Sequence, residues 1–130
     1  MANDTHLAVL KRDVAAWNEW RAAQPAMRPN LSSASLRGLD LAKVDLSGAD
    51  LSKADLRGTI LSGAVMVDAD LAGVNFFKAV LDGADLSRAN LIGALFLNCA
   101  QLVATRNWQS SFRDPDLACG APIPAIATRS

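Results

Sequence analysis

The sequence lacks most of the residue types and motifs that enzymes and metal sites use. Tyrosine is absent from the 130 residues, His6 is the single histidine, and Cys99 and Cys119 are the two cysteines. No glycine-rich phosphate loop, zinc-ligand spacing or nucleophile elbow is present. We therefore expect no catalytic residue, no cofactor and no metal site, and we predict that the chain is not an enzyme.

The sequence also lacks an excess of charge of either sign and a long apolar run. Lys and Arg number 13 and Asp and Glu number 13, so no overall field steers the chain to nucleic acid or to an anionic membrane. No apolar run approaches the ~18 residues of a membrane span, and the first residues do not resemble a signal peptide. We predict a cytoplasmic chain without nucleic-acid or membrane partners.

The two cysteines are too few for a disulfide framework, which favours reduced thiols. Cys99 falls in a small inward position of the repeat described below, where it would pack as a small apolar residue. Cys119 lies in the tail, and we expect it to pack there as well. A Cys99–Cys119 bridge is the alternative that the sequence leaves open, and we consider it the less favoured one.

Large apolar residues recur every five positions through the middle of the chain. Two positions before each lies a second series in which nine of thirteen residues are alanine, and the residue between the two series is usually Asp or Asn. Seven of the eight glycines close a five-residue unit. The large series consists of Leu31, Leu36, Leu41, Leu46, Leu51, Leu56, Leu61, Met66, Leu71, Phe76, Leu81, Leu86, Leu91 and Phe96.

A period of five fits neither a straight helix nor a straight strand. A helix turns ~100° per residue, so steps of five scatter these residues around its axis. A strand alternates its faces, so an odd period places successive residues on opposite sides. The pattern fits a backbone that turns about 90° in each unit, because four units then close a square coil and residues n and n+20 stack. Both apolar series then point inward, and the Asp or Asn between them points outward.

These repeats resemble the pentapeptide-repeat family, whose consensus is A-(D/N)-L-x-x. The units 49–53, 54–58, 69–73 and 84–88 match it closely, and the resemblance covers residues 34–98. It implies an all-β solenoid, a right-handed quadrilateral β-helix of about three coils. It does not imply one function, because members of one fold family do different things.

We divide the chain into three parts of one structural domain: 1–30, 31–98 and 99–130. Apolar residues at helical spacing, such as Leu7, Leu10, Val14 and Trp17, predict an α-helical cap over residues 5–23. Residues 31–98 form the repeat coil. Residues 99–130 form a non-repeat tail with one short helical turn near 105–113.

The outward aspartates are expected to solvate the walls and to bond nearby backbone groups. Asp50 and Asp70 stack in this arrangement, but nothing supplies a second type of ligand for a cation. More unusual are outward positions near the C-terminal end of the coil that carry apolar residues. We treat them as a candidate interaction or tail-docking surface: Phe77, Leu95, Leu97, Ile92, Ile60 and Val80.

Three explanations fit this surface. Trp108 and Phe112 of the tail would fold back and cover it, the last coils would form a homodimer through it, or the exposure has no role. In the predicted register Phe77 lies beneath Leu97 and Ile60 beneath Val80.

The most economical function is a protein-interaction or structural module with an unknown protein partner. The alternative is mimicry of DNA, since some pentapeptide-repeat proteins resemble a duplex and bind DNA gyrase. About three coils give a rod of about 16 Å, a length over which duplex DNA carries roughly nine negative charges. Residues 31–98 contain eight Asp and six Lys or Arg, a net charge of −2. Length and charge therefore disfavour the mimic.

Overall fold

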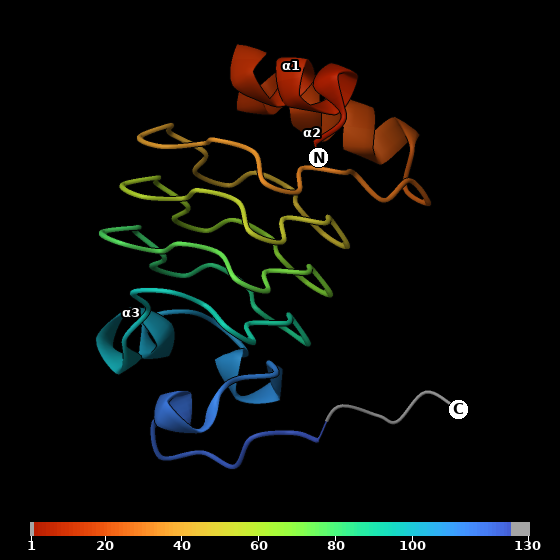
Figure 1. The fold of residues 1–130 in the computed structure, drawn as a ribbon. Coiled ribbons are helices and arrows are strands. Elements are labelled where there is room, and N and C mark those ends of the chain that lie inside the picture. Colours follow the sequence, from red (N-terminus) through yellow and green to blue (C-terminus); the bar gives the residue numbers. More distant parts are fainter. Residues whose placement is uncertain (1, 126–130) are drawn as a thin grey trace.

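The computed structural model describes residues 2–125. From Asn30 to Asn75, every fifth residue forms a parallel β-bridge to the residue twenty positions further on, as in Asp50–Asp70 and Asp70–Asn90. The bridges are single residues, and the chain between them winds in flat turns that stack on one another (Figure 1). The predicted stacking of residues n and n+20 is therefore confirmed.

The bridges define four walls, which we number in chain order. The first wall carries Asn30, Asp50, Asp70 and Asn90; the second carries Ser35, Asp55, Asn75 and Leu95; the third carries Asp40, Ile60 and Val80; and the fourth carries Asp45, Val65 and Asp85.

The interior of the coil is filled by the two apolar series. Thirteen of the fourteen large residues, from Leu31 to Leu91, are buried. Most of the small series is buried with them, and Thr59 satisfies its hydroxyl by donating to the carbonyl of Leu36 at 2.7 Å. Packing of this kind leaves the outer walls and the two ends as the surfaces available for function.

The last residue of each five-residue unit turns the corner in the left-handed region. Gly73 has φ of +68°, and the same position is held by Lys53 at +60° and Asp68 at +59°. Glycine reaches this conformation without the steric cost that other residues meet there. This explains why glycines close so many units.

The outward aspartates shape the same turns. The Oδ1 atom of Asp50 accepts hydrogen bonds from the backbone N–H of Ser52 at 3.0 Å and from its hydroxyl at 2.7 Å. Asp45 and Asp85 bond the residue two positions further on in the same way. These carboxylates therefore stabilise the turn, as short polar side chains do in Asx turns.

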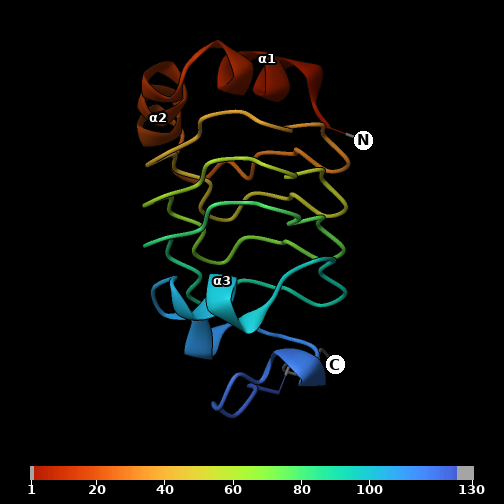
Figure 2. The ribbon, with the colours of Figure 1, turned by 90° about the vertical axis from the view of Figure 1, so that its left-hand side faces the viewer.

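Two helices lie over the end of the coil where the chain begins (Figures 1 and 2). They are α1 (Asp4–Arg12) and α2 (Val14–Ala23). The helical cap predicted over residues 5–23 is divided into two helices at Asp13. Asp13 adopts an extended conformation, and its side chain accepts the N–H of Ala16 at 2.6 Å. Asp13 thus serves as the N-cap of a second helix.

The tail lies at the opposite end of the coil and contains three short elements. They are α3 (Cys99–Val103) and the 3₁₀ turns η1 (Trp108–Ser110) and η2 (Pro115–Leu117). The turn predicted near 105–113 corresponds to η1, whereas α3 and η2 were not predicted. Between these elements Arg106 bridges Asp85 and Phe112 bridges Asn90, so the tail extends the ladder on the fourth and first walls.

No helix within residues 2–125 is long and apolar enough to cross a membrane.

Candidate functional site

Several of the exposed large apolar residues gather where the second and third walls meet. Ile60 and Val80 form a bridge on the third wall and are 37% and 40% exposed. Phe77 lies at the corner between the two walls and is 47% exposed, and Leu95 on the second wall is 51% exposed. The two other predicted members, Ile92 and Leu97, are half-buried.

Phe96 was predicted to point inward and does not. It is 66% exposed, and its φ is +56°, whereas the thirteen other large residues of the series have negative φ. The chain therefore leaves the repeat after Leu95, and the predicted stacking of Leu97 on Phe77 is replaced by another contact. The rings of Phe96 and Phe77 meet edge to face, with centroids 5.6 Å apart. We call Ile60, Phe77, Val80, Leu95 and Phe96 the apolar corner.

The tail up to residue 125 does not cover the apolar corner. Trp108 is buried against the end of the coil, and Phe112 takes part in the ladder beside Asn90 on the first wall. The proposed fold-back of Trp108 and Phe112 over this surface is therefore wrong. The five residues of the apolar corner stay exposed with the described part of the tail in place.

Cationic side chains border the apolar corner. A shallow groove of about 300 Å³ is lined by Arg37, Arg57, Gly58, Phe77 and Lys78. The Nζ of Lys78 lies 5.4 Å from the centroid of the Phe77 ring, which is within the range of a cation–π contact. Arg57 forms an ion pair with Asp55 at 2.6 Å, and this hydrogen bond lowers the pKa of Asp55. Arg37 and Lys78 are exposed to solvent.

The stacked aspartates do not form a recognisable metal site. Within residues 2–125, no group of three or more His, Cys, Asp or Glu side chains is placed to hold a metal ion. Asp50 and Asp70 are neighbours on the first wall. In each, one carboxylate oxygen accepts a hydrogen bond from a backbone N–H of the turn that follows it. The amide of Asn90 lies 3.5 Å from Asp70. The arrangement is that of a polar ladder.

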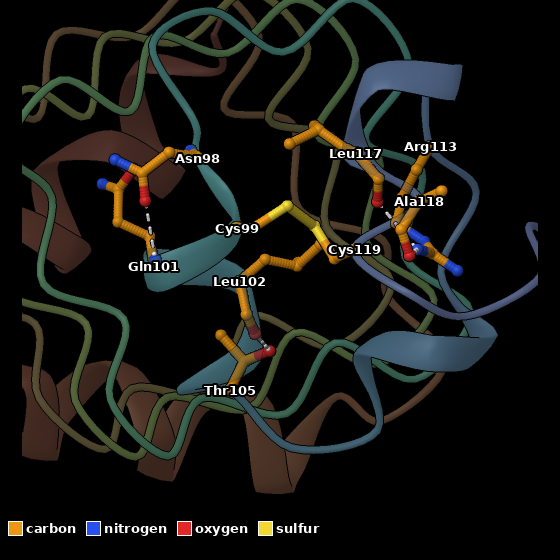
Figure 3. Close-up of a disulfide and its surroundings, with 9 residues drawn as sticks. All are labelled: Asn98, Cys99, Gln101, Leu102, Thr105, Arg113, Leu117, Ala118 and Cys119. Atoms are coloured by element: carbon orange, nitrogen blue, oxygen red, sulfur yellow. Dashed lines mark hydrogen bonds between the residues drawn. A yellow bond between two sulfur atoms is a disulfide. The ribbon is translucent and has the colours of Figure 1, made fainter.

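The two cysteines form a disulfide, so the expectation of two reduced thiols is wrong (Figure 3). Their Cα atoms are 5.6 Å apart, in the usual range for a bridge. Cys99 is not in an inward repeat position, because the chain has left the repeat and Cys99 begins α3. The tail then loops over the end of the coil and returns Cys119 to the start of that helix.

Arg113 organises the tail around a buried charge. The side chain is 2% exposed, and the guanidinium donates hydrogen bonds to five carbonyls of the tail. It also lies 5.1 Å from the ring centroid of Trp108. Loss of water around the group lowers the pKa of Arg113. The accepting carbonyls belong to Gln109, Ser111, Leu117, Ala118 and Pro122.

The tail also satisfies the open backbone edge of the last coil. On the fourth wall Arg106 donates to Ala84 O at 2.7 Å and accepts from Leu86 N at 2.9 Å. On the first wall Phe112 does the same with Ala89 and Leu91. Within residues 2–125 no bridge extends the third wall beyond Val80. At the corner that precedes this wall, the side chain of Gln101 donates to the carbonyls of Phe76 and Ala79. At the corner that follows the first wall, the carboxylate of Asp114 accepts from Gly93 N at 2.9 Å.

A family model of pentapeptide repeats matches residues 30–63 and 69–105 in eight copies. The chain therefore belongs to the pentapeptide-repeat family, whose members are right-handed β-helices. The family predicted from the repeat is confirmed. No curated protein sequence matches the chain.

Several solved structures are similar to this chain. A pentapeptide repeat protein from the thylakoid lumen of Arabidopsis thaliana is 30% identical, with 70% of this chain and 68% of that one covered and a TM-score of 0.45. A pentapeptide repeat protein of Nostoc PCC 7120 is 32% identical over 85% of this chain and 95% of that one, with a TM-score of 0.38. Rfr23 from the cyanobacterium Cyanothece 51142 is 26% identical over 69% and 64%, with a TM-score of 0.36.

Proposed function

We propose that the chain is a non-enzymatic protein-interaction module whose binding surface is the apolar corner. The observation that carries this proposal is that, within residues 2–125, other segments cover both ends of the coil while the apolar corner stays exposed. Exposed apolar residues that cluster on one part of a surface mark interaction sites more often than residues scattered singly.

The apolar corner suits binding because it rests on a rigid support. Ile60, Val80 and Leu95 are held by backbone bridges, and the interior beneath them is packed with buried residues. A surface that is already ordered loses little conformational freedom when a partner docks. The two phenylalanines supply the large aromatic side chains that dominate binding energy in many interfaces.

The chemistry of the rim points to a partner that combines apolar and acidic side chains. Arg37 and Lys78 are exposed beside Phe77, and Arg57 forms an ion pair with Asp55. Charges at the rim of an interface increase the rate of association and the discrimination between partners more than they increase affinity. We therefore expect binding that weakens as salt concentration rises.

The test compares three baits: the wild-type chain, Phe77→Asp and Val65→Asp. Val65 on the fourth wall is the matched control, because it is also an outward apolar residue and is 36% exposed. A specific partner is retained by the wild type and Val65→Asp, whereas Phe77→Asp weakens its binding roughly 30-fold or more. Identical proteins retained by all three baits would contradict the proposal.

A second copy of the chain is the alternative occupant of the apolar corner. The formal net charge of zero leaves no overall repulsion between copies. Light scattering after size-exclusion chromatography separates the alternatives. A dimer in the wild type that becomes a monomer in Phe77→Asp identifies the second copy, and a monomeric wild type leaves the other protein as the occupant.

Mimicry of DNA stays a prediction that the low charge of residues 31–98 disfavours. Inhibition of gyrase supercoiling by the purified chain at low micromolar concentration would reverse that preference.

A further inference from the structure

The disulfide joins the two ends of the segment that closes the last coil. Cys99 begins α3 and Cys119 follows η2, twenty residues further on. Every tail contact with the coil edge described above, from Gln101 to Asp114, comes from between them. A cross-link at these positions acts directly on this segment.

The closed segment contains a group whose burial is energetically unfavourable. The guanidinium of Arg113 is withdrawn from water, and its hydrogen-bond partners within residues 2–125 are backbone carbonyls, with no carboxylate among them. A buried cation without a counter-charge is unfavourable even when it is fully hydrogen-bonded. Because the tail itself supplies all five acceptor carbonyls, opening of the tail would return this charge to water, and the closed state depends on the packing of Trp108 and on the cross-link.

The two cysteines of the disulfide are not fully buried. Cys99 and Cys119 are both half-buried. Thiol–disulfide exchange requires a thiolate to approach one sulfur along the S–S axis, and exposure of that sulfur controls the rate.

From these three observations we infer that the Cys99–Cys119 bond is a redox latch, which a dithiol reductant opens to release the segment 99–119 from the edge of the last coil. The thiolate of the reductant attacks one Sγ, the S–S bond breaks, and a mixed disulfide forms. The second thiol of the reductant then displaces the cysteine. The chain gains two electrons and two protons as Cys99 and Cys119 become thiols, and the reductant becomes a disulfide.

The latch links the state of the tail to the redox state of the surroundings. In an oxidising compartment the segment is closed, and in a reducing cytoplasm it is open. Release uncovers the backbone groups of Leu86 and Leu91 together with the buried face of Trp108. The α1–α2 end has no cysteine and stays closed in both conditions.

Hydrogen exchange read by mass spectrometry tests the latch on the full chain before and after treatment with dithiothreitol. Upon reduction, exchange at the amides of Leu86, Leu91 and Gly93 is expected to rise roughly 100-fold, the factor set by losing a loop closure of this length. Peptides from residues 50–65 and from α2 serve as internal controls and should not change. The variant Cys99→Ser with Cys119→Ser should show the same fast exchange without reductant and no response to it.

Unchanged protection at Leu86 and Leu91 after complete reduction would overturn the latch, because the tail would then be docked without its cross-link. An equal rise in all peptides would also overturn it, since the bond would then support the whole coil.

Discussion

The two ends of the coil present the same problem, a row of unpaired backbone groups, and the chain meets it in two ways. At the first end, side chains from α1 and α2 reach the edge: Trp17 Nε1 donates to Asp45 O at 2.7 Å, and Asn30 N donates to His6 Nδ1 at 3.0 Å. At the last end, backbone from the tail continues the ladder, and a disulfide closes the segment. Unpaired sheet edges invite association, and both devices prevent it.

The difference shows where each end is vulnerable. The first end depends on packing and on individual hydrogen bonds, so it should respond to single substitutions and to pH. The last end depends on the docking of one segment that a single covalent bond closes, so it should respond to the redox state. The following substitutions separate these two dependences, starting with the largest expected effect.

Truncation of Trp17 to alanine should weaken the packing of α2 on the first end of the coil. The side chain is fully buried, contacts Trp20 with ring centroids 5.1 Å apart, and bonds the coil edge. We expect a loss of about 3–5 kcal/mol in the free energy of unfolding, as for other buried aromatic residues. Urea denaturation followed by tryptophan fluorescence measures it. A loss below about 1 kcal/mol would show that α2 contributes little to the closure.

Removal of the disulfide in Cys99→Ser with Cys119→Ser should weaken the last end. A loop of twenty residues corresponds to a loss of about 3 kcal/mol in the free energy that holds the tail on the coil. Differential scanning calorimetry of the oxidised wild type and the variant gives the difference. Addition of dithiothreitol should lower the temperature at which the tail of the wild type unfolds, and it should leave the main transition of the coil and the variant unchanged.

Substitution of Asn18 by alanine tests a single contact at the first edge. The Asn18 side chain donates to Lys43 O at 3.1 Å and accepts from Asp45 N at 2.8 Å. Because both backbone groups can be reached by water once Asn18 is shortened, we expect a loss of only about 1 kcal/mol. Glu19→Ala, an exposed neighbour on the same helix, is the control and should change stability by less than about 0.5 kcal/mol.

Acidification should weaken the contact of α1 with the first end of the coil and leave the docking of the tail at the last end unchanged. Burial, with a smaller contribution from the nearby charge of Arg21, lowers the pKa of His6 from its ordinary value of 6.5. The neutral imidazole is needed, because Nδ1 accepts the Asn30 N–H. Its contribution to stability is therefore complete above about pH 6.5 and is lost as pH falls through the lowered folded pKa.

Urea unfolding of the wild type and of His6→Gln between pH 7.5 and pH 5 measures this effect. The difference in stability between the two chains should shrink as pH falls. A constant difference across that range would assign His6 a packing role alone.

The register of the coil could be predicted because it depends on residue size. Leu51, Leu71 and Leu91 occupy the same inward place in successive coils, where a polar side chain would be buried without a partner. The Asp or Asn beside each of them points outward, because water and nearby backbone groups can bond its side chain there. Because the five-residue unit repeats many times, a few units that depart from the pattern do not change the predicted register.

The departures from the prediction depend on backbone conformation and chain path, which residue size does not encode. Phe96 is as large and apolar as Phe76, yet its positive φ turns it outward. The disulfide requires the return of Cys119 over the end of the coil, a path with no repeat to mark it. Arg113 is a buried charge in a tail of mixed composition, where sequence rules place arginine at the surface.

The twenty-residue coil has a mechanical consequence for how the chain tolerates insertions. It behaves as a screw thread with a quarter turn for every five residues, so an inserted copy of residues 50–69 adds one complete turn. The tail would then meet the same walls about 4.8 Å further along the axis. Five added residues would instead turn the tail by a quarter and set Arg106 and Phe112 against the wrong walls. Length in this fold changes in whole turns.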